Sequence, residues 1–541
     1  MRHRLLTDMC GGAVGVDVAR PVVRQARVSA HPKVSAVRQF LLVTLVLCSS
    51  SLARAQAAGI DTRITFTMAD DDIMKGPEES TSGSPTLPNF TPTSSSRLFY
   101  DDYERRDNGL ENLSHLVLYG HKPGFFAGVD TEAALVLRAE LLQKQDVALR
   151  DDGSYIRLSK AFGETKKLSL VAFPVSAHRF ALGYSYDLSW GGAGIFKSTA
   201  SPGFKVQYDA SGMYLFAGAK TGLTQTRMPD NSIENDTVWG VLGGAGVDIM
   251  DSVRVEGGSG YFYRGKIDKS ELQTPDTNGR TKSAPWEGFG GSAQVVYHQG
   301  VPIGVPIDFR LYRNDPLKRE DFFNLEDYPG GISFIAQSEV NWLGQTLQDF
   351  DRPNSTVVQQ GRAADLTFKL KVDKARFFAL GVYRELAYLL FNVPSYPPFV
   401  SFPKGIEAKP EAFAYFGFDY FIEEWHLTPG ASVGVQKPAY QTARVSAGNN
   451  APQSLGAQTL VFRSESELPE VLNPGDKVSM ILAGKVTFRW ELSEMLGAVG
   501  EFQAAYDRNR RILAQDANGV AIRLATDPKI FGFAFMMQAR L

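Results

Sequence analysis

Five histidines are the first residues to consider, because imidazole groups bind metals and transfer protons near neutral pH. After residue 57 they are His115, His121, His178, His298 and His426. No two of them have the spacing of a metal-binding pair such as His-x-x-x-His, and none lies in a nucleophile motif. We therefore expect no enzyme, no catalytic residues, no cofactor and no metal site.

Two other segments carry residue types that could bind a ligand. The acidic run Asp70–Asp72 lacks the ligand spacing of a calcium-binding loop, so we interpret it as a solvated charge run. The glycine-rich stretch WGGAGIF (190–196) follows a strand pattern but precedes no helix, and a phosphate-binding loop needs that helix. We expect a flexible loop there.

Charged residues recur at every second position of long alternating segments. In KVSMILAGKVTFRWEL, Phe488 and Trp490 share one strand face, whereas Lys485 and Arg489 share the other. Such polar faces are expected to line the inside of a barrel. The candidate lumen-lining residues are Arg138, Glu140, Arg179, Asp187, Arg254, Glu256, Asp308, Arg310, Glu339, Lys369, Lys371, Lys485, Arg489, Glu491 and Arg540.

The two signs of charge are balanced on these inward faces, whereas a strongly ion-selective pore needs rings of one sign. Two interpretations follow. The charges pair across neighbouring strands and stabilise a wet interior, or some of them form a charged constriction inside a pore.

The elements that would position these residues are long strands. The alternating segments run for 9 to 15 residues, which suits membrane-crossing strands of roughly 9–11 residues better than ordinary strands of roughly 5–6. RFALGYSYDL (179–188) and the final stretch FGFAFMMQARL (531–541) belong to this set. In the final stretch, Phe535 is expected to face lipid and Met536 the lumen.

The connections between the segments support a barrel. Reading back from Leu541, long and short connections alternate six times, as they do between the two ends of a membrane barrel. Farther upstream the alternation fails, and one strand near 300–361 is misassigned or missing. A raw count gives 19 strands, but closed single-chain barrels have even numbers. We predict an all-β, antiparallel up-and-down transmembrane barrel of about 18 strands (16–20).

The N-terminal segment predicts export. Residues 1–57 contain basic residues, an apolar core from Phe40 to Leu47, and Ala-x-Ala spacing around Ala55 and Ala57. This is the layout of a signal peptide, here with an N-terminal extension, and we expect cleavage near Ala55 or Ala57. Cleavage removes both cysteines, Cys10 and Cys48. It leaves 49 basic and 57 acidic residues, a net charge of −8. An acidic chain of this kind does not suggest nucleic-acid binding.

Residues 58–112 are polar and rich in turn formers, which favours a flexible periplasmic arm. Within the arm, DTRITFTM alternates like a short strand. The barrel is predicted to comprise residues 113–541 and to close its last strand against a first strand near NLSHLVLYG (112–120). The arm could bind envelope proteins.

Taken together, the signal peptide, the cysteine-free mature chain, the Tyr- and Trp-rich strands and the apolar last strand resemble Gram-negative outer-membrane β-barrels of the porin-like class. The resemblance implies an outer-membrane location and assembly through the C-terminal strand. It also implies a channel for small hydrophilic solutes. The alternative is a barrel that anchors or forms the conduit of a secretion, polysaccharide-export or surface-motility machine. The proline- and aromatic-rich loop 392–405 is expected to be a stiff cap, an infolded constriction or a contact surface.

Overall fold

The structure is a computed structural model of the 541-residue chain. It describes residues 60–70, 73, 110–141, 147–151, 153–177, 180–185, 188–190, 201–227, 233–266, 274–275, 281–282, 284–300, 331–352, 354–392, 400–444, 457–462, 469–493, 495–515 and 521–540. The predicted signal peptide, 1–57, lies outside these residues.

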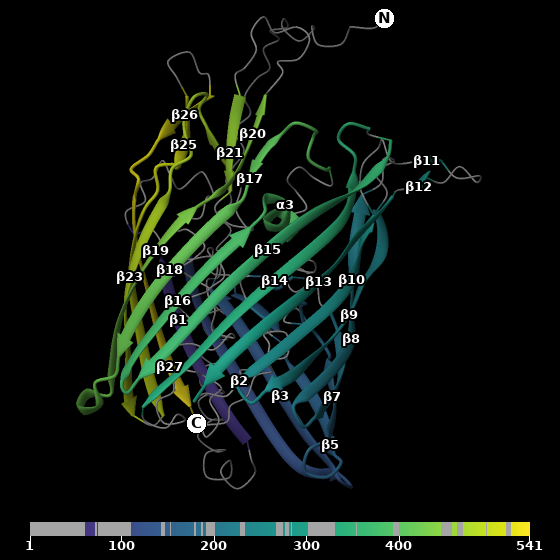
Figure 1. Ribbon diagram of the computed structural model, residues 1–541, viewed down its shortest axis with the longest axis vertical. Helices are drawn as coiled ribbons and strands as arrows, with labels where there is room; N and C mark the ends of the chain where they lie inside the picture. The colour runs from purple at the N-terminus through teal and green to yellow at the C-terminus, as the bar shows by residue number, and fades with distance from the viewer. Residues whose placement is uncertain are drawn as a thin grey trace, which may run out of the picture. The chain divides into compact units, whose positions relative to one another are not determined.

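Long antiparallel strands form one closed sheet (Figure 1). Nineteen strands join it, but β4 and β5 lie one after the other along β3 and share a single place, so the barrel has 18 strands. The predicted all-β barrel and its strand number are confirmed. The strands are β1 (Ile60–Asp70), β2 (Leu110–Phe126), β3 (Val129–Leu141), β4 (Val147–Asp151), β5 (Tyr155–Ala161), β6 (Lys167–Phe173), β7 (Gly203–Ala210), β8 (Met213–Arg227), β9 (Ile233–Met250), β10 (Val253–Lys266), β13 (Pro285–Gln299), β14 (Ile332–Gln348), β15 (Thr356–Val372), β16 (Ala375–Arg384), β18 (Glu411–Tyr420), β19 (Leu427–Lys437), β23 (Ile481–Ser493), β24 (Leu496–Tyr506) and β27 (Lys529–Arg540).

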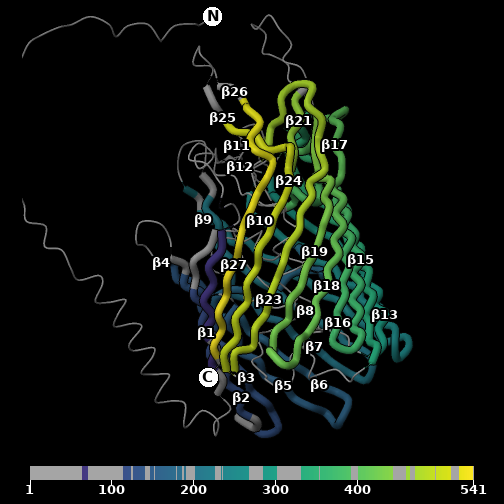
Figure 2. Tube along the Cα trace, turned by 90° about the vertical axis from the view of Figure 1, so that its left-hand side faces the viewer, coloured from purple at the N-terminus to yellow at the C-terminus, as the bar shows by residue number. Residues whose placement is uncertain are grey.

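Closure takes place between the two ends of the chain. β27 pairs with β1, and β1 pairs in turn with β2 (Figure 2). The predicted barrel boundary at residue 113 is therefore wrong, because Ile60–Asp70 is a barrel strand that lies between β27 and β2. Its alternation was visible in DTRITFTM, but the polar residues around it hid its role. Residues 71–72 and 74–109 of the predicted arm lie outside the described residues.

The two ends of the barrel differ in their connections. At one end, here called the turn end, neighbouring strands such as β7 and β8 are joined by tight turns, and the C-terminus lies at this end (Figure 1). At the other end, the loop end, the connections from β10 to β13, β16 to β18, β19 to β23 and β24 to β27 carry extra elements. The last three are the long connections read from the C-terminus, so the alternation predicted there is confirmed. The sequence predicts a misassigned or missing strand near 300–361, and there the connection from Gln299 to Ile332 is long although it joins strands at the turn end. Residues 301–330 lie outside the described residues.

Several connections contain short helices or strands. At the loop end they are α3 (Leu386–Leu389), η8 (Leu390–Asn392), the sheet of β17 (Glu407–Lys409), β20 (Ala439–Arg444), β21 (Ala457–Phe462) and β22 (Glu470–Leu472), and the hairpins β11 (Thr274–Pro275)–β12 (Thr281–Lys282) and β25 (Arg511–Gln515)–β26 (Ala521–Ala525). One turn at the turn end contains η9 (Glu423–Trp425). No described helix is long and apolar enough to cross a membrane.

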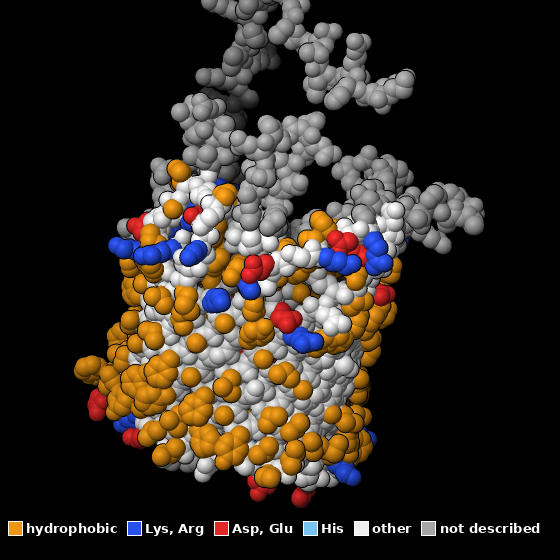
Figure 3. Space-filling view, turned by 45° about the horizontal axis from the view of Figure 1, so that its top comes forward, with side chains coloured by type: hydrophobic (Ala, Val, Ile, Leu, Met, Phe, Trp, Pro, Cys, Tyr) orange, Lys and Arg blue, Asp and Glu red, His pale blue; other side chains and the backbone are white. Residues whose placement is uncertain are grey.

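The outer face of the barrel is apolar (Figure 3). Large side chains such as Val340, Val433 and Phe502 point outward and are 55–63% exposed. Aromatic pairs lie toward both ends of the strands. The ring centroids of Trp239 and Tyr261, near the loop end, are 5.4 Å apart, and those of Phe377 and Phe418, near the turn end, are 5.0 Å apart. An apolar band between two aromatic girdles is the outer surface of a transmembrane barrel.

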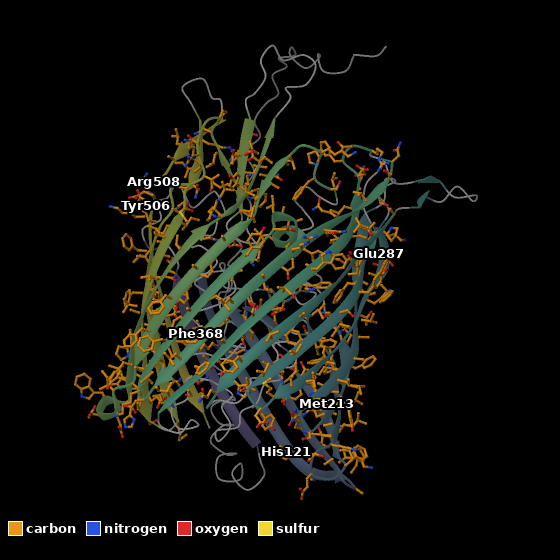
Figure 4. The ribbon with its side chains drawn as sticks, in the orientation of Figure 1. His121, Met213, Glu287, Phe368, Tyr506 and Arg508 are labelled. Carbon is orange, nitrogen blue, oxygen red and sulfur yellow. The ribbon has the colours of Figure 1, made fainter. Side chains whose placement is uncertain are left out.

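Polar residues mark the limits of this band (Figure 4). Glu287, Tyr506 and Arg508 lie toward the loop end and His121 at the turn end, whereas Phe368 lies between them. Arg508 donates a 2.8 Å hydrogen bond to the Tyr506 hydroxyl, so this aromatic group sits beside a charge, as interfacial tyrosines do. The last strand follows the predicted alternation. Phe531 and Met537 are about two-fifths exposed, whereas Ala534 and Met536 are buried inside.

Candidate functional site

The inward faces of the strands carry many of the predicted lumen-lining residues. Arg138, Glu256, Glu339, Lys371 and Lys485 are buried on the inward face. Those that are half-buried there are Arg254, Lys369, Arg489 and Glu491. Glu140 and Arg540 lie in β3 and β27, but their side chains lie outside the description, as do Arg179, Asp187, Asp308 and Arg310 altogether. That these residues line a path for solutes stays a prediction.

From β16 to β24 the inward charges pair across neighbouring strands. Lys485 of β23 bonds Glu501 of β24 at 2.8 Å, and both side chains are at most 1% exposed. Arg376 of β16 likewise pairs with Asp419 of β18, and both side chains are buried. We call this stretch the ion-paired wall. Here the buried charges form the cross-strand pairs that one of the two interpretations expects.

A third pair in this wall is extended by an amide. Arg384 of β16 bonds Glu411 of β18 at 2.7 Å, and Gln436 of β19 donates to the other oxygen of Glu411 at 2.6 Å. Three consecutive strands are thereby joined on their inner side, in addition to their backbone ladders. The hydrogen bonds that a buried carboxylate accepts compensate for the loss of its hydration.

The segment between β6 and β7 is not a barrel strand. RFALGYSYDL was predicted to cross the membrane with Phe180, Leu182 and Tyr184 toward lipid, and this prediction is wrong. These three side chains are at most 6% exposed and pack inside the barrel. The prediction failed because a segment that packs against the inner wall of a barrel can have apolar side chains at every second position, as a strand that faces lipid does. We call residues 174–177, 180–185 and 188–190 the infolded segment.

Glycines on the inner wall make room for the infolded segment. A Cβ atom added to Gly218 of β8 would lie 2.3 Å from the Phe180 ring. At Gly258 of β10 it would lie 2.9 Å from Leu182, and at Gly290 of β13 it would lie 2.9 Å from Trp190. Each of these glycines is therefore required for close approach, and each seats one large side chain. We call β8 to β15 the glycine-lined wall.

A second insertion comes from the connection after β16. α3 and η8 fold against the same wall: a Cβ at Gly361 of β15 would lie 2.5 Å from the Tyr388 backbone, and one at Gly288 would lie 2.6 Å from the Phe391 ring. We call these residues, Leu386–Asn392, the helical insert. Of the predicted loop 392–405, residues 393–399 lie outside the described residues.

The two insertions are bonded to each other. Asn341 of β14 donates to the Leu188 carbonyl at 2.7 Å, and the Tyr388 hydroxyl donates to the same carbonyl. Trp190 and Phe391 meet edge to face at 5.3 Å. Arg264 of β10 then donates to the Phe391 carbonyl at 2.7 Å and stacks on Trp286. The insertions thus form a single layer inside the barrel.

Buried charges on the wall bind the backbone of the infolded segment. Lys220 of β8 donates to the carbonyls of Phe180 at 2.7 Å and Ala177 at 3.4 Å. Glu339 of β14 accepts from the amides of Tyr184 and Ser185. The sequence pattern placed Glu339 on the inward face but gave no sign of these partners, which lie more than 150 residues away in the chain.

The described residues contain no group of three or more His, Cys, Asp or Glu side chains that could hold a metal ion. The site therefore offers a barrel interior with hydrogen-bonded charges of both signs and a layer folded against one side.

Comparisons with known proteins find similarity in structure only. No family model matches the chain, and no curated protein matches its sequence. Of its length, 90% aligns with 98% of OccAB2 from Acinetobacter baumannii, at 8% identity and a TM-score of 0.40. The Pseudomonas aeruginosa proteins OpdL (89% and 97% covered, 9% identity, TM-score 0.38) and outer membrane protein opdK (89% and 98%, 9%, TM-score 0.40) align similarly. These similarities are too distant to bear on function.

Proposed function

We propose that this protein is an outer-membrane channel of the porin type that lets small hydrophilic solutes pass. The observation that carries the proposal is the closed 18-strand barrel with an apolar, aromatic-edged outer face and charged residues of both signs inside. Even-numbered closed barrels of this kind are the form in which single chains cross bacterial outer membranes. Its mechanism is passive: solutes move along a polar interior, and the proposal assigns no chemical step to any residue.

The infolded segment and the helical insert set the width of this interior. Both lie against the glycine-lined wall, so they narrow the barrel from one side. The remaining side includes the ion-paired wall, where each buried charge is matched by an opposite one. We therefore expect weak selectivity between small cations and anions.

The test is a planar-bilayer recording with purified, refolded protein. We expect discrete current steps and a small reversal potential in a salt gradient, together with partial block by solutes that enter the pore. A folded protein that inserts but gives no current steps would overturn the proposal. A strong preference for one sign of ion would contradict the balanced interior.

The C-terminal strand supports one further part of the proposal. β27 pairs with β24 and β1 and presents an apolar outer face, so we propose that it is the segment recognised by the barrel-assembly machinery. The alternative role, as conduit of a larger envelope machine, rested on an arm at 58–112. β1 takes eleven residues of that arm into the barrel, and nothing in the part of the chain that the structure describes favours this alternative.

A further inference from the structure

The infolded segment contains a turn whose shape depends on a glycine. Gly183 has φ +123°, a conformation that other residues rarely adopt. A Cβ there would lie 2.8 Å from the Ser189 Cα atom and 3.2 Å from the Glu339 Oε1 atom. Both the backbone angle and the space therefore require glycine at this position.

The turn directs two consecutive amides at one carboxylate. The Tyr184 amide lies 3.1 Å from both oxygens of Glu339, and the Ser185 amide lies 2.6 Å from Oε2. Successive backbone N–H groups that converge in this way form a concave anion-binding site. Its occupant here is a side chain of the barrel wall.

Glu339 is fixed from the wall side as well. Glu339 is only 1% exposed, and its Oε1 atom accepts a 2.6 Å hydrogen bond from the Ser292 hydroxyl of β13. Its own backbone amide donates to Asp365 of β15 at 3.1 Å. The carboxylate is therefore held by the wall on one side and by the infolded segment on the other.

The other end of the segment is held with the opposite sign. The Lys220 ammonium group donates to the carbonyls of Ala177 and Phe180, so a cation binds carbonyls where Glu339 binds amides. Hydrogen bonds to charged groups are stronger than neutral ones. We call these two groups of hydrogen bonds clamps. The Glu339 clamp holds the turn at Gly183, which lies in the middle of the infolded segment.

We propose that Glu339 is a positioning residue that holds the infolded segment against the glycine-lined wall and thereby sets the width of the lumen. The effect on current rests on the proposed channel function, whereas the effect on the segment does not. Replacing the carboxyl group by an amide exchanges one of the two acceptor oxygens for an NH₂ group, so the Tyr184 and Ser185 amides lose an acceptor and the turn around Gly183 detaches from the wall.

The direct test is hydrogen–deuterium exchange of the folded protein in detergent, followed for peptides covering residues 180–190. In Glu339→Gln, the Tyr184 and Ser185 amides should exchange roughly tenfold faster or more, as expected from losing one buried hydrogen bond. Gly183→Ala attacks the same contact from the segment side and should give the same result. Heat-modifiable migration on gels confirms that each variant has formed the barrel.

Glu256→Gln is the matched control. Glu256 is a buried carboxylate of the same wall, 3% exposed, and it accepts a 2.8 Å bond from the Tyr214 hydroxyl of β8. This variant also removes one interior negative charge, but its hydrogen bond lies within the wall. Exchange at residues 180–190 should stay as in the unmodified protein.

Conductance then separates the two proposals. If the channel proposal is right, Glu339→Gln and Gly183→Ala raise the mean single-channel conductance, while Glu256→Gln changes it much less. Faster exchange without any current in any variant supports the clamp and overturns the channel. Unchanged exchange in both Glu339→Gln and Gly183→Ala overturns the clamp, whatever the current does. Failure of Glu339→Gln to fold leaves Gly183→Ala to decide.

Discussion

The glycine-lined wall and the ion-paired wall belong to one sheet, yet their inner faces are stabilised in different ways. In the first, Gly218, Gly258 and Gly290 have no side chains, and large side chains of the infolded segment fill the space above them. In the second, Lys485 and Glu501 form an ion pair across neighbouring strands. The same backbone ladder therefore supports two kinds of interior, one a packed layer and the other a charge network.

The largest difference between the walls should appear when one buried charge is removed. Lys485→Met leaves Glu501 buried without its cation, which costs about 3–5 kcal/mol in barrels as in other proteins if the charge is not compensated. We expect the free energy of unfolding, measured by urea titration in lipid vesicles, to fall by that amount.

The double variant Lys485→Met/Glu501→Leu removes both charges and should recover most of this loss. If the single variant is as stable as the unmodified protein, the charge network does not stabilise the ion-paired wall. The comparison between the two walls would then fail on that side.

The outer faces should not differ between the walls, because both meet the same lipid. Phe368 of β15 and Phe502 of β24 point outward from the glycine-lined wall and the ion-paired wall, and they are 37% and 63% exposed. An arginine at either position should destabilise the barrel, by about 2–4 kcal/mol at the midplane and by less toward the ends of the strands. Vesicle insertion and urea unfolding measure the loss, and leucine at the same positions is the control. A loss confined to one wall would show that only that wall faces lipid.

Filling a glycine seat should cost less. In Gly290→Ala, the new Cβ would lie 2.2 Å from the Trp342 carbonyl and 2.9 Å from the Trp190 ring, so both must shift. Overpacking of this kind costs about 1–3 kcal/mol. Gly381→Ala is the control, since the nearest atom to a Cβ there is 4.0 Å away, and we expect a change within about 0.5 kcal/mol. Equal unfolding free energies for the two variants would argue against a seat at Gly290.

The smallest effect is expected from an exposed ion pair at the turn end. Lys374 bonds Glu423 at 2.6 Å, and this hydrogen bond holds the pKa of Glu423 below its usual range and raises the pKa of Lys374. A carboxylate with a lowered pKa stabilises the fold above its ordinary pKa, and this contribution is lost as the pH falls through the lowered value. Glu423→Gln should therefore differ slightly from the unmodified protein at neutral pH and not at all well below about pH 4. Urea midpoints across this range provide the measurement, and a gap that persists in acid would exclude the ion pair as its cause.

Strand periodicity predicted the barrel because a strand between water and lipid must alternate. Segments such as Ile332–Gln348 and Ile481–Ser493 show that alternation over much of their length, and the structure places them in the sheet. The same rule failed at residues 179–188, since an apolar alternation does not tell lipid from a packed interior. It also undervalued Ile60–Asp70, whose partner β27 lies at the other end of the chain.

The candidate site was less accessible from sequence because its contacts join distant residues. Period two placed Glu339 and Lys485 on inward faces, but it could not pair Glu339 with Tyr184 or Trp190 with Gly290. One signal was present and unused. Glycines at inward positions of β8, β10 and β13 interrupt otherwise regular strands, and a missing side chain inside a barrel indicates that another segment occupies the space.

The seam between β1 and β27 has a consequence for engineering. Arg63 lies opposite Arg540, so the start of the first strand and the end of the last lie on adjacent strands at the same end of the barrel. Neighbouring strands are only about 4.8 Å apart, and a short glycine-rich linker spans that gap. A circular permutant that joins these ends and begins instead at the turn between β23 and β24 keeps every strand pairing. A peptide or fluorophore tag fused to its new termini would lie at that turn, and other turn-end connections could be opened in the same way.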